Sequence, residues 1–163
     1  MSKIYSTKEI LLEKMKHYCS YQERCHKEVL DKMFSLKIDA DWRDEILLDL
    51  MRDDFINEER YARSIVRGKF KINSWGKVKI RQSLKQNGIT DKLISMAFDE
   101  INAADYLNKI EVLLKKKYAL LHKESEPVRS HKTTQHLMQK GYEHHLVMEV
   151  FNQLKLQDTG LDE

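Results

Sequence analysis

"LKQNGITDKLISMAFDEI" at residues 84–101 and "LMQKGYEHHLVMEVFNQL" at residues 137–154 follow one pattern. With an offset of 137 − 84 = 53 and no gap, leucine falls on leucine, glycine on glycine, and the later apolar positions coincide. The stretch "MFSLKIDADWRDEILLDL" at 33–50 fits the same frame at an offset of 84 − 33 = 51, with Lys37 in the glycine position. A period of about 50 residues is typical of tandem structural repeats.

The glycine of this frame predicts a particular turn. Gly88 and Gly141 each suit the left-handed residue that follows a helix, because glycine lacks the Cβ that disfavours this conformation. The apolar residue after each glycine, Ile89 or Tyr142, would then pack back against the last turn of the helix, as in a Schellman motif. Each unit is therefore expected to be helix, turn, helix, with a further helix upstream.

The frame predicts an all-α fold of three tandem three-helix repeats, at residues 6–52, 53–102 and 103–156. Units of this size bury little surface alone and have to share faces with their neighbours, so an elongated, curved array is expected. The acidic tail at 157–163 is expected to be frayed. The expected oligomeric state is a monomer.

The composition is that of a charge-rich helical protein. The chain has 163 residues, of which 41% are hydrophobic and 34% charged, with one proline and five glycines. No apolar run approaches the ~20 residues of a membrane span, and "MSKIYSTKEI" lacks the apolar stretch of a secretory signal, so no membrane association and a cytoplasmic location are expected. Ser6 stands three residues before Glu9, the spacing of a capping box.

The charges are segregated along the chain. "DDFINEERYARSIVRGKFK" at 53–71 begins acidic, with Asn57 as the expected N-cap of a helix and two glutamates in its first turn. From Asp39 to Glu59 there are nine acids and two bases, whereas from Arg60 to Thr90 there are nine bases and no acid. Such segregation attracts polyanions or acidic protein surfaces. The alternative interpretation is a solvated helix face without a partner.

This middle segment resembles the middle of RecX proteins, the regulators of the RecA recombinase. The family's pattern is an acidic entry before an aromatic residue and alanine, a basic helix, a glycine before a basic residue and isoleucine, and then Leu-x-x-x-Gly-Ile. The family's third unit has two basic residues before Leu-x-x-x-Gly-aromatic, and the resemblance covers nearly the whole chain. The matching positions are Asp54, Asn57, Glu58, Tyr61, Ala62, Gly76, Lys79, Ile80, Leu84, Gly88 and Ile89, and then Arg129, Lys132, Leu137, Gly141 and Tyr142.

The resemblance implies a non-enzymatic regulator, and no cofactor or metal is expected. RecX-like proteins bind the active RecA filament on single-stranded DNA and lie in its groove. There they suppress ATP hydrolysis, strand exchange and coprotease activity. The resemblance therefore implies a role in DNA recombination, DNA repair and the SOS response. The implied partners are that filament and the DNA within it. The expected contact residues are basic: Arg60, Arg63, Arg67, Lys69, Lys71, Lys77, Lys79, Arg81, Lys85, Arg129 and Lys132.

Two other binding functions stay open, namely a general nucleic-acid-binding helical module and an adaptor for an acidic protein. Residues 75–98 could pass for a helix-turn-helix motif, but Asp91, at the start of its second helix, and the acids that follow would repel phosphates. Phe70 and Trp75 lie among the bases and could stack on nucleobases, although aromatic residues at helical spacing belong more often to a core.

Enzymatic and metal-binding functions find little support. The sequence has no Gly-rich phosphate loop, no carboxylate pair in distinct environments and no nucleophile–base signature. His17, Cys19, Cys25 and His26 lack the spacing of a zinc finger, and a second ligand pair is missing. Buried thiols and surface histidines are the simpler expectation.

Overall fold

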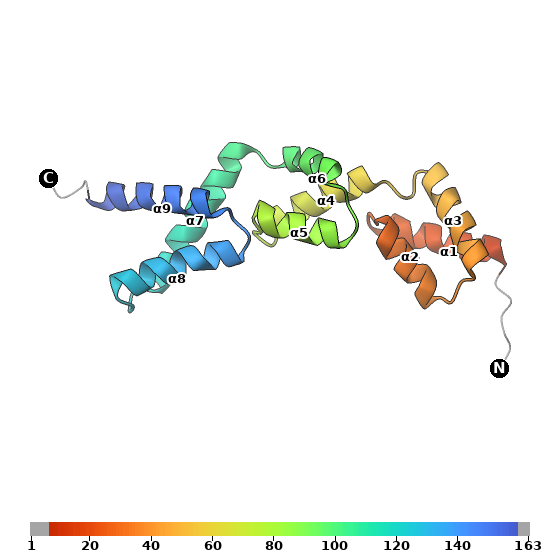
Figure 1. The fold of residues 1–163 in the computed structure, drawn as a ribbon, viewed down its shortest axis with the longest axis horizontal. Coiled ribbons are helices and arrows are strands. Elements are labelled where there is room, and N and C mark those ends of the chain that lie inside the picture. The colour runs from red at the N-terminus through yellow and green to blue at the C-terminus, as the bar shows by residue number, and fades with distance from the viewer. Residues whose placement is uncertain (1–6, 160–163) are drawn as a thin grey trace. The chain divides into compact units, whose positions relative to one another are not determined.

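The computed structural model describes residues 7–159, and every regular element in that range is a helix (Figure 1). The all-α class is therefore confirmed for the described residues. The chain divides into two compact units: the first runs to Ser64 and adds Leu84–Ala97, and the second comprises Ile65–Ser83 and the residues from Phe98 onward. No helix in the described range combines the length and the apolar character needed to cross a membrane.

The first unit contains α1 (Lys8–Tyr21), α2 (His26–Ser35) and α3 (Ala40–Arg52), which pack side by side (Figure 1). Ser6, the expected cap of α1, lies outside the described residues, and the N-cap is Thr7, whose hydroxyl accepts from the N–H of Ile10. The three helices enclose one core, whose buried members are Met15, Cys19, Val29, Met33, Ile38, Ile46, Leu50 and Ile56.

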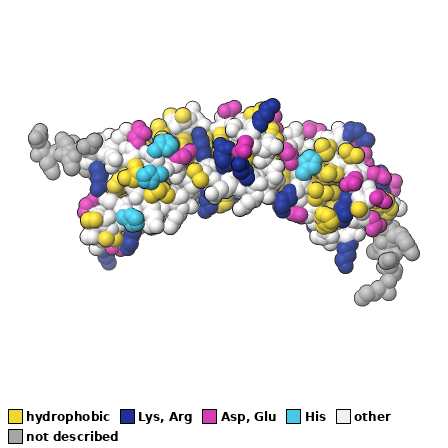
Figure 2. Space-filling view, in the orientation of Figure 1, with side chains coloured by type: hydrophobic (Ala, Val, Ile, Leu, Met, Phe, Trp, Pro, Cys, Tyr) yellow, Lys and Arg dark blue, Asp and Glu magenta, His cyan; other side chains and the backbone are white. Residues whose placement is uncertain are grey.

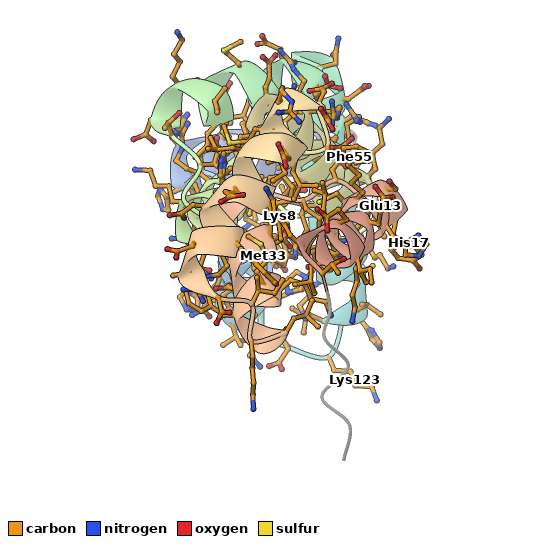
Figure 3. All side chains as sticks on the ribbon, turned by 90° about the vertical axis from the view of Figure 1, so that its right-hand side faces the viewer. Lys8, Glu13, His17, Met33, Phe55 and Lys123 are labelled. Carbon is orange, nitrogen blue, oxygen red and sulfur yellow. The ribbon has the colours of Figure 1, made fainter. Side chains whose placement is uncertain are left out.

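The two cysteines belong to different helices and both are buried. Cys19 lies in α1, whereas Cys25 is the N-cap of α2 and forms a capping box with Glu28. Burial raises the pKa of the Cys19 thiol to about 11, so it stays protonated at neutral pH. Figure 3 looks onto these helices, and there Met33 lies between them while His17 points outward from α1. The cysteines and His17 therefore face different surroundings, as core and surface residues do.

Two helices contribute to both units. α4 (Glu58–Lys71) and α5 (Lys77–Gln86) each cross a unit boundary, while α6 (Asp91–Ala97) belongs to the first unit and is followed by the 3₁₀ turn η1 (Phe98–Glu100). Asn57 caps α4 as predicted, because its Oδ1 accepts from the N–H of Arg60 at 2.9 Å.

The second unit adds α7 (Ala103–Leu120), α8 (Glu126–Gln139) and α9 (His144–Thr159), which pack on one another. Residues 157–159, the first three of the expected frayed tail, are helical because α9 continues through them, whereas residues 160–163 lie outside the described range.

The predicted turn recurs at all three positions of the sequence frame. The N–H of Ile89 donates to the carbonyl of Leu84 at 3.1 Å, and that of Tyr142 to Leu137 at 3.1 Å. Gly88 and Gly141 have φ values of 78° and 90°, and Lys37 adopts φ 54° in the same position of the first repeat. The Schellman motif is thus confirmed, and Lys37 shows that the frame tolerates a residue with a Cβ.

The turn between α4 and α5 is held by the turn between α8 and α9, within the second unit. The N–H of Gly76 donates to the carbonyl of Lys140, and the N–H of Val78 to that of Gly141, each at 2.9 Å. A Cβ built on Gly76 would lie 2.2 Å from the Gly141 carbonyl oxygen, and one on Gly141 would lie 2.3 Å from Cβ of Lys79. Only glycine permits this approach of two backbones.

Candidate functional site

The basic run from Arg60 onward separates into arginines that are paired with acids and lysines that are not. Arg60, in the first turn of α4, donates from Nε to Glu23 at 2.7 Å and from Nη1 to Asp54 at 2.9 Å. Its Nη2 also donates to the main-chain carbonyl of Asp54 at 2.8 Å. Asp54 has a positive φ of 57°, so this arginine ties down the strained turn that precedes α4.

The next two arginines also face carboxylates. Arg63 pairs with Glu59 one turn earlier in α4, at 2.9 Å. Arg67 donates from Nη1 to Glu100 of η1 at 2.9 Å. These pairs neutralise much of the positive charge that the sequence places on α4, and at the end of α5 Lys85 is likewise paired, with Asp91 at 3.1 Å.

Three lysines in the middle of the run contact aromatic rings instead. The ammonium groups of Lys69 and Lys79 lie 4.7 Å and 4.6 Å from the ring centroid of Trp75. That of Lys77 lies 4.9 Å from the centroid of Tyr106. All three distances are in the range of cation–π attraction. This attraction positions an ammonium group without neutralising its charge.

We call Lys69, Lys71, Lys77, Lys79 and Trp75 the lysine cluster. All five residues belong to the second unit, on the last turn of α4, the connecting turn and the first turn of α5. In the part of the chain that the structure describes, none of the four lysines forms an ion pair with a carboxylate. Figure 2 shows dark-blue basic side chains gathered over the middle of the chain, where Figure 1 places α4 and α5. The cluster is the best-defined source of positive potential in the run.

The rest of the second unit fixes the turn that carries Trp75. Ser74 has a positive φ of 54°, and its carbonyl accepts from the hydroxyl of Tyr142 at 3.1 Å. The hydroxyl of Tyr106 accepts from the N–H of Lys77 at 3.0 Å and donates to Glu143 at 2.5 Å. Burial and the Glu143 bond both raise the pKa of Tyr106, so this phenol remains a donor at neutral pH.

The two aromatic candidates for base stacking differ. Phe70 is 6% exposed and packs 5.8 Å from the ring of Tyr106, so it is a core residue and cannot stack on a base. Trp75 is half-buried, with two ammonium groups over its ring. Of these two aromatic candidates, only Trp75 is partly exposed.

Two models of RecX domains match this chain. The model of the second three-helix domain matches residues 57–97, and the model of the third matches residues 104–151. The chain belongs to the RecX family. The lysine cluster lies within the match to the second RecX domain, and the turn that supports it, at Lys140–Tyr142, lies within the match to the third.

Relatives of the RecX family cover most of the chain. A protein of Oceanobacillus iheyensis named regulatory protein RecX is 28% identical over 138 residues, which are 85% of this chain and 51% of the relative. A protein of the same name from Streptococcus agalactiae is 30% identical over 90% of this chain and 57% of its own length. The chain thus spans about half the length of these curated relatives. Both relatives are named as regulatory proteins and neither as an enzyme.

A solved structure supports the same fold. The crystal structure of RecX from Lactobacillus salivarius matches with a TM-score of 0.81 and 29% identity, over 91% of this chain and 97% of that one. The two matching models of three-helix RecX domains lie within the second and third repeats that the sequence frame predicts.

The two predicted site residues of the third RecX domain lie apart from the cluster in the sequence and make local contacts. Arg129 donates from Nε to the carbonyl of Tyr118 at 2.7 Å and lies 3.5 Å from the centroid of that ring. Lys132 pairs with Glu124 at 2.5 Å. Both residues join α8 to the end of α7 and the turn after it.

Sequence reasoning placed Arg81 in the site, and the structure stacks its guanidinium 5.2 Å from the ring of Phe98. It did not include Lys140 among the contact residues, and the ammonium group of Lys140 lies 3.5 Å from the carbonyl oxygen of Asn73 in the α4–α5 turn. The contact joins residues 67 positions apart, so the local charge pattern gave no signal for it.

Proposed function

We propose that this chain binds the filament of a RecA recombinase on single-stranded DNA, lies in its groove and inhibits its ATPase, strand-exchange and coprotease activities. The observation that carries the proposal is the lysine cluster: its four lysines have no carboxylate partner among the described residues, and two of them, Lys69 and Lys79, hold their ammonium groups over the ring of the partly exposed Trp75. Positive side chains beside an aromatic ring suit a surface that follows a nucleic-acid backbone. Membership of a family of regulatory proteins supports a regulatory role.

The proposal divides the basic residues by role. Lys69, Lys71, Lys77 and Lys79 supply charge to phosphates or to acidic groups of the filament. Arg60 and Arg63 act mainly inside the protein, because their guanidinium groups are already held by carboxylates.

The test is steady-state ATP hydrolysis by RecA on single-stranded DNA while this protein is titrated in. The informative variant is Lys69→Ala with Lys77→Ala and Lys79→Ala. A matched control, Lys14→Ala with Lys27→Ala and Lys123→Ala, removes the same charge from other parts of the surface. Inhibition by the wild type and the control but not by the cluster variant supports the proposal, and equal inhibition by all three proteins contradicts the site.

The two alternative functions predict different salt dependences. For binding to single-stranded DNA, the logarithm of the affinity falls with the logarithm of the salt concentration, with a slope of about −0.7 for each phosphate neutralised. An adaptor that buries an apolar surface on a protein would give a much flatter line.

Trp42→Phe leaves Trp75 as the single tryptophan, so quenching of its fluorescence by oligo(dT) reports contact with bases directly.

A further inference from the structure

The second unit has a second group of basic side chains, which is made of residues other than those of the lysine cluster. A hollow of about 330 Å³ opens where the α4–α5 turn, the second half of α7 and the end of α8 meet. Four basic side chains line it, and they are Lys116, Lys117, His136 and Lys140. We call this the basic hollow. Among the described residues that line it, none is acidic.

The basic hollow also exposes two large aliphatic side chains. Ile72, at the tip of the α4–α5 turn, is 84% exposed, and Leu120, the last residue of α7, is 68% exposed. They are the two most exposed aliphatic residues among the large hydrophobics of the described chain. An isoleucine side chain that is exposed to water at a turn contributes no hydrophobic stabilisation to the fold. Beside a basic hollow, the same side chain can serve as an apolar contact for a ligand.

No acidic side chain among the described lining residues balances the positive charges of the hollow. Burial, together with the positive charges of Lys117 and Lys140, lowers the pKa of His136, so its imidazole is neutral at pH 7. The third neighbouring ammonium group, that of Lys116, adds to the same field. An anion placed in the hollow would relieve this repulsion and would favour the protonated form of His136.

We propose that the basic hollow binds an acidic peptide segment that carries an aliphatic side chain, supplied by a partner protein. Three ammonium groups, together with His136 as a fourth group that can take up a proton, complement a row of carboxylates, and Ile72 and Leu120 offer apolar contacts for an aliphatic side chain. The volume lies within the range of sites that enclose small ligands or side chains. A nucleic-acid strand fits less well, because sites for single strands combine basic groups with aromatic stacking surfaces and the described lining contains no aromatic residue.

The inference does not depend on the proposed function, because the hollow uses none of the residues of the lysine cluster. Its test uses the full chain and two fluorescein-labelled peptides in a polarisation assay. One peptide alternates Asp and Glu with a leucine at every third position, and the other has alanine in place of each leucine. The leucine peptide is expected to bind and the alanine peptide to bind about tenfold more weakly. Equal binding of the two peptides would contradict the apolar half of the site.

Matched variants locate the binding. Lys116→Ala with Lys117→Ala, both on α7, is expected to weaken binding of the leucine peptide by about tenfold, whereas Lys14→Ala with Lys123→Ala leaves it unchanged. Ile72→Ser is expected to weaken it by several-fold, whereas Leu48→Ser, at an aliphatic residue of α3 that is 65% exposed, has no effect. Both pairs change the surface alone, so retained melting temperatures are expected for all four proteins. Binding that ignores the α7 lysines would overturn the assignment.

The pH dependence gives a second readout. Bound carboxylates favour the protonated form of His136, so binding of the leucine peptide is expected to tighten as the pH is lowered from 7.5 toward the depressed pKa of this imidazole. His136→Gln removes this dependence and leaves binding at pH 7.5 nearly intact.

Two results would show that the hollow binds something other than an acidic peptide. Oligo(dT) that competes with the leucine peptide at equal concentration and loses affinity in the α7 variant would make the hollow a nucleic-acid site. Sedimentation that shows self-association, abolished by the same variant, would make a second copy of this chain the occupant. If the filament assay gives no inhibition but the peptide results hold, the proposed function fails and this inference stands.

Discussion

The carbonyl oxygen of Gly141 accepts a hydrogen bond from the N–H of Val78 at 2.9 Å, and the same oxygen would lie 2.2 Å from a Cβ on Gly76. Two turns that are 63 or more residues apart in the sequence therefore meet backbone to backbone. The contact fixes the turn that carries Trp75, because Ser74 and Gly76 are both bonded to the α8–α9 turn.

This contact predicts that Gly76→Ala is strongly destabilising. The new methyl group would meet main-chain atoms of Gly141 and Tyr142, which cannot rotate away. We expect a loss of about 3 kcal/mol in the free energy of unfolding, at the upper end of overpacking effects. Gly68→Ala is the matched control: no atom lies within 4 Å of its Cβ position and the residue is inside α4, so a gain of about 1 kcal/mol is expected. Urea unfolding of both variants measures the difference, and equal effects would contradict the close approach.

Arg60 is predicted to act in stability and not in filament binding. Arg60→Ala removes bonds to Glu23 and to both the side chain and main chain of Asp54. Because the guanidinium is only partly buried, we expect a loss of about 1 kcal/mol. If the chain inhibits RecA-dependent ATP hydrolysis as proposed, that inhibition should be unchanged at a temperature where the variant is folded. Loss of inhibition without loss of stability would return Arg60 to the binding surface.

Leu84 is predicted to be a core residue of the repeat frame. Its side chain is 0% exposed, so Leu84→Ala should reduce the free energy of unfolding by about 2–5 kcal/mol. Leu107, on α7, is 43% exposed, and Leu107→Ala should cost less than about 0.5 kcal/mol. Chemical denaturation followed by circular dichroism separates the two, and a small effect at Leu84 would show that the frame does not mark the core.

Glu126 is predicted to stabilise the protein in a pH-dependent way. Hydrogen bonds from Lys155, Tyr118 and Ser130 lower the pKa of this carboxyl from 4.5 to about 2. Because the pKa of the folded state is depressed, the stabilisation is present above pH 4.5 and is lost as the pH falls toward 2. The difference in unfolding free energy between wild type and Glu126→Gln should therefore be constant from pH 8 to pH 6 and shrink between pH 4.5 and 2. A difference that does not change with pH would rule out this contribution.

The sequence predicted the local features of the fold because they depend on neighbouring residues. A glycine at a fixed distance after a leucine specifies a Schellman turn, and Asn57 before two glutamates specifies a helix start, whatever surrounds them. The frame even placed Lys37 in the turn, where it adopts the left-handed conformation without glycine.

The site was harder to predict because the partners of its charges are distant. Arg60 pairs with Glu23, which is 37 positions away in the sequence, and Arg67 pairs with Glu100, which is 33 positions away. Distant acids therefore neutralise part of a run that contains only basic charges in the sequence. The sequence also could not tell Phe70 from Trp75, since the burial of Phe70 and the position of the turn that carries Trp75 depend on Tyr106 and Tyr142, which are more than 30 residues away in the chain. The basic hollow was missed for the same reason.

The order of synthesis adds a consequence of the bonds between the two turns. Gly76 and Val78 precede their acceptors by 140 − 76 = 64 and 141 − 78 = 63 residues, so a ribosome must add about that many residues before the donors can be paired. At translation rates of about 5–20 residues per second, this delay lasts roughly 3–13 s. During that interval Lys69, Trp75 and Lys79 have been synthesised, but the segment that fixes their turn has not. The candidate site is thus completed late, by residues that are not themselves part of it.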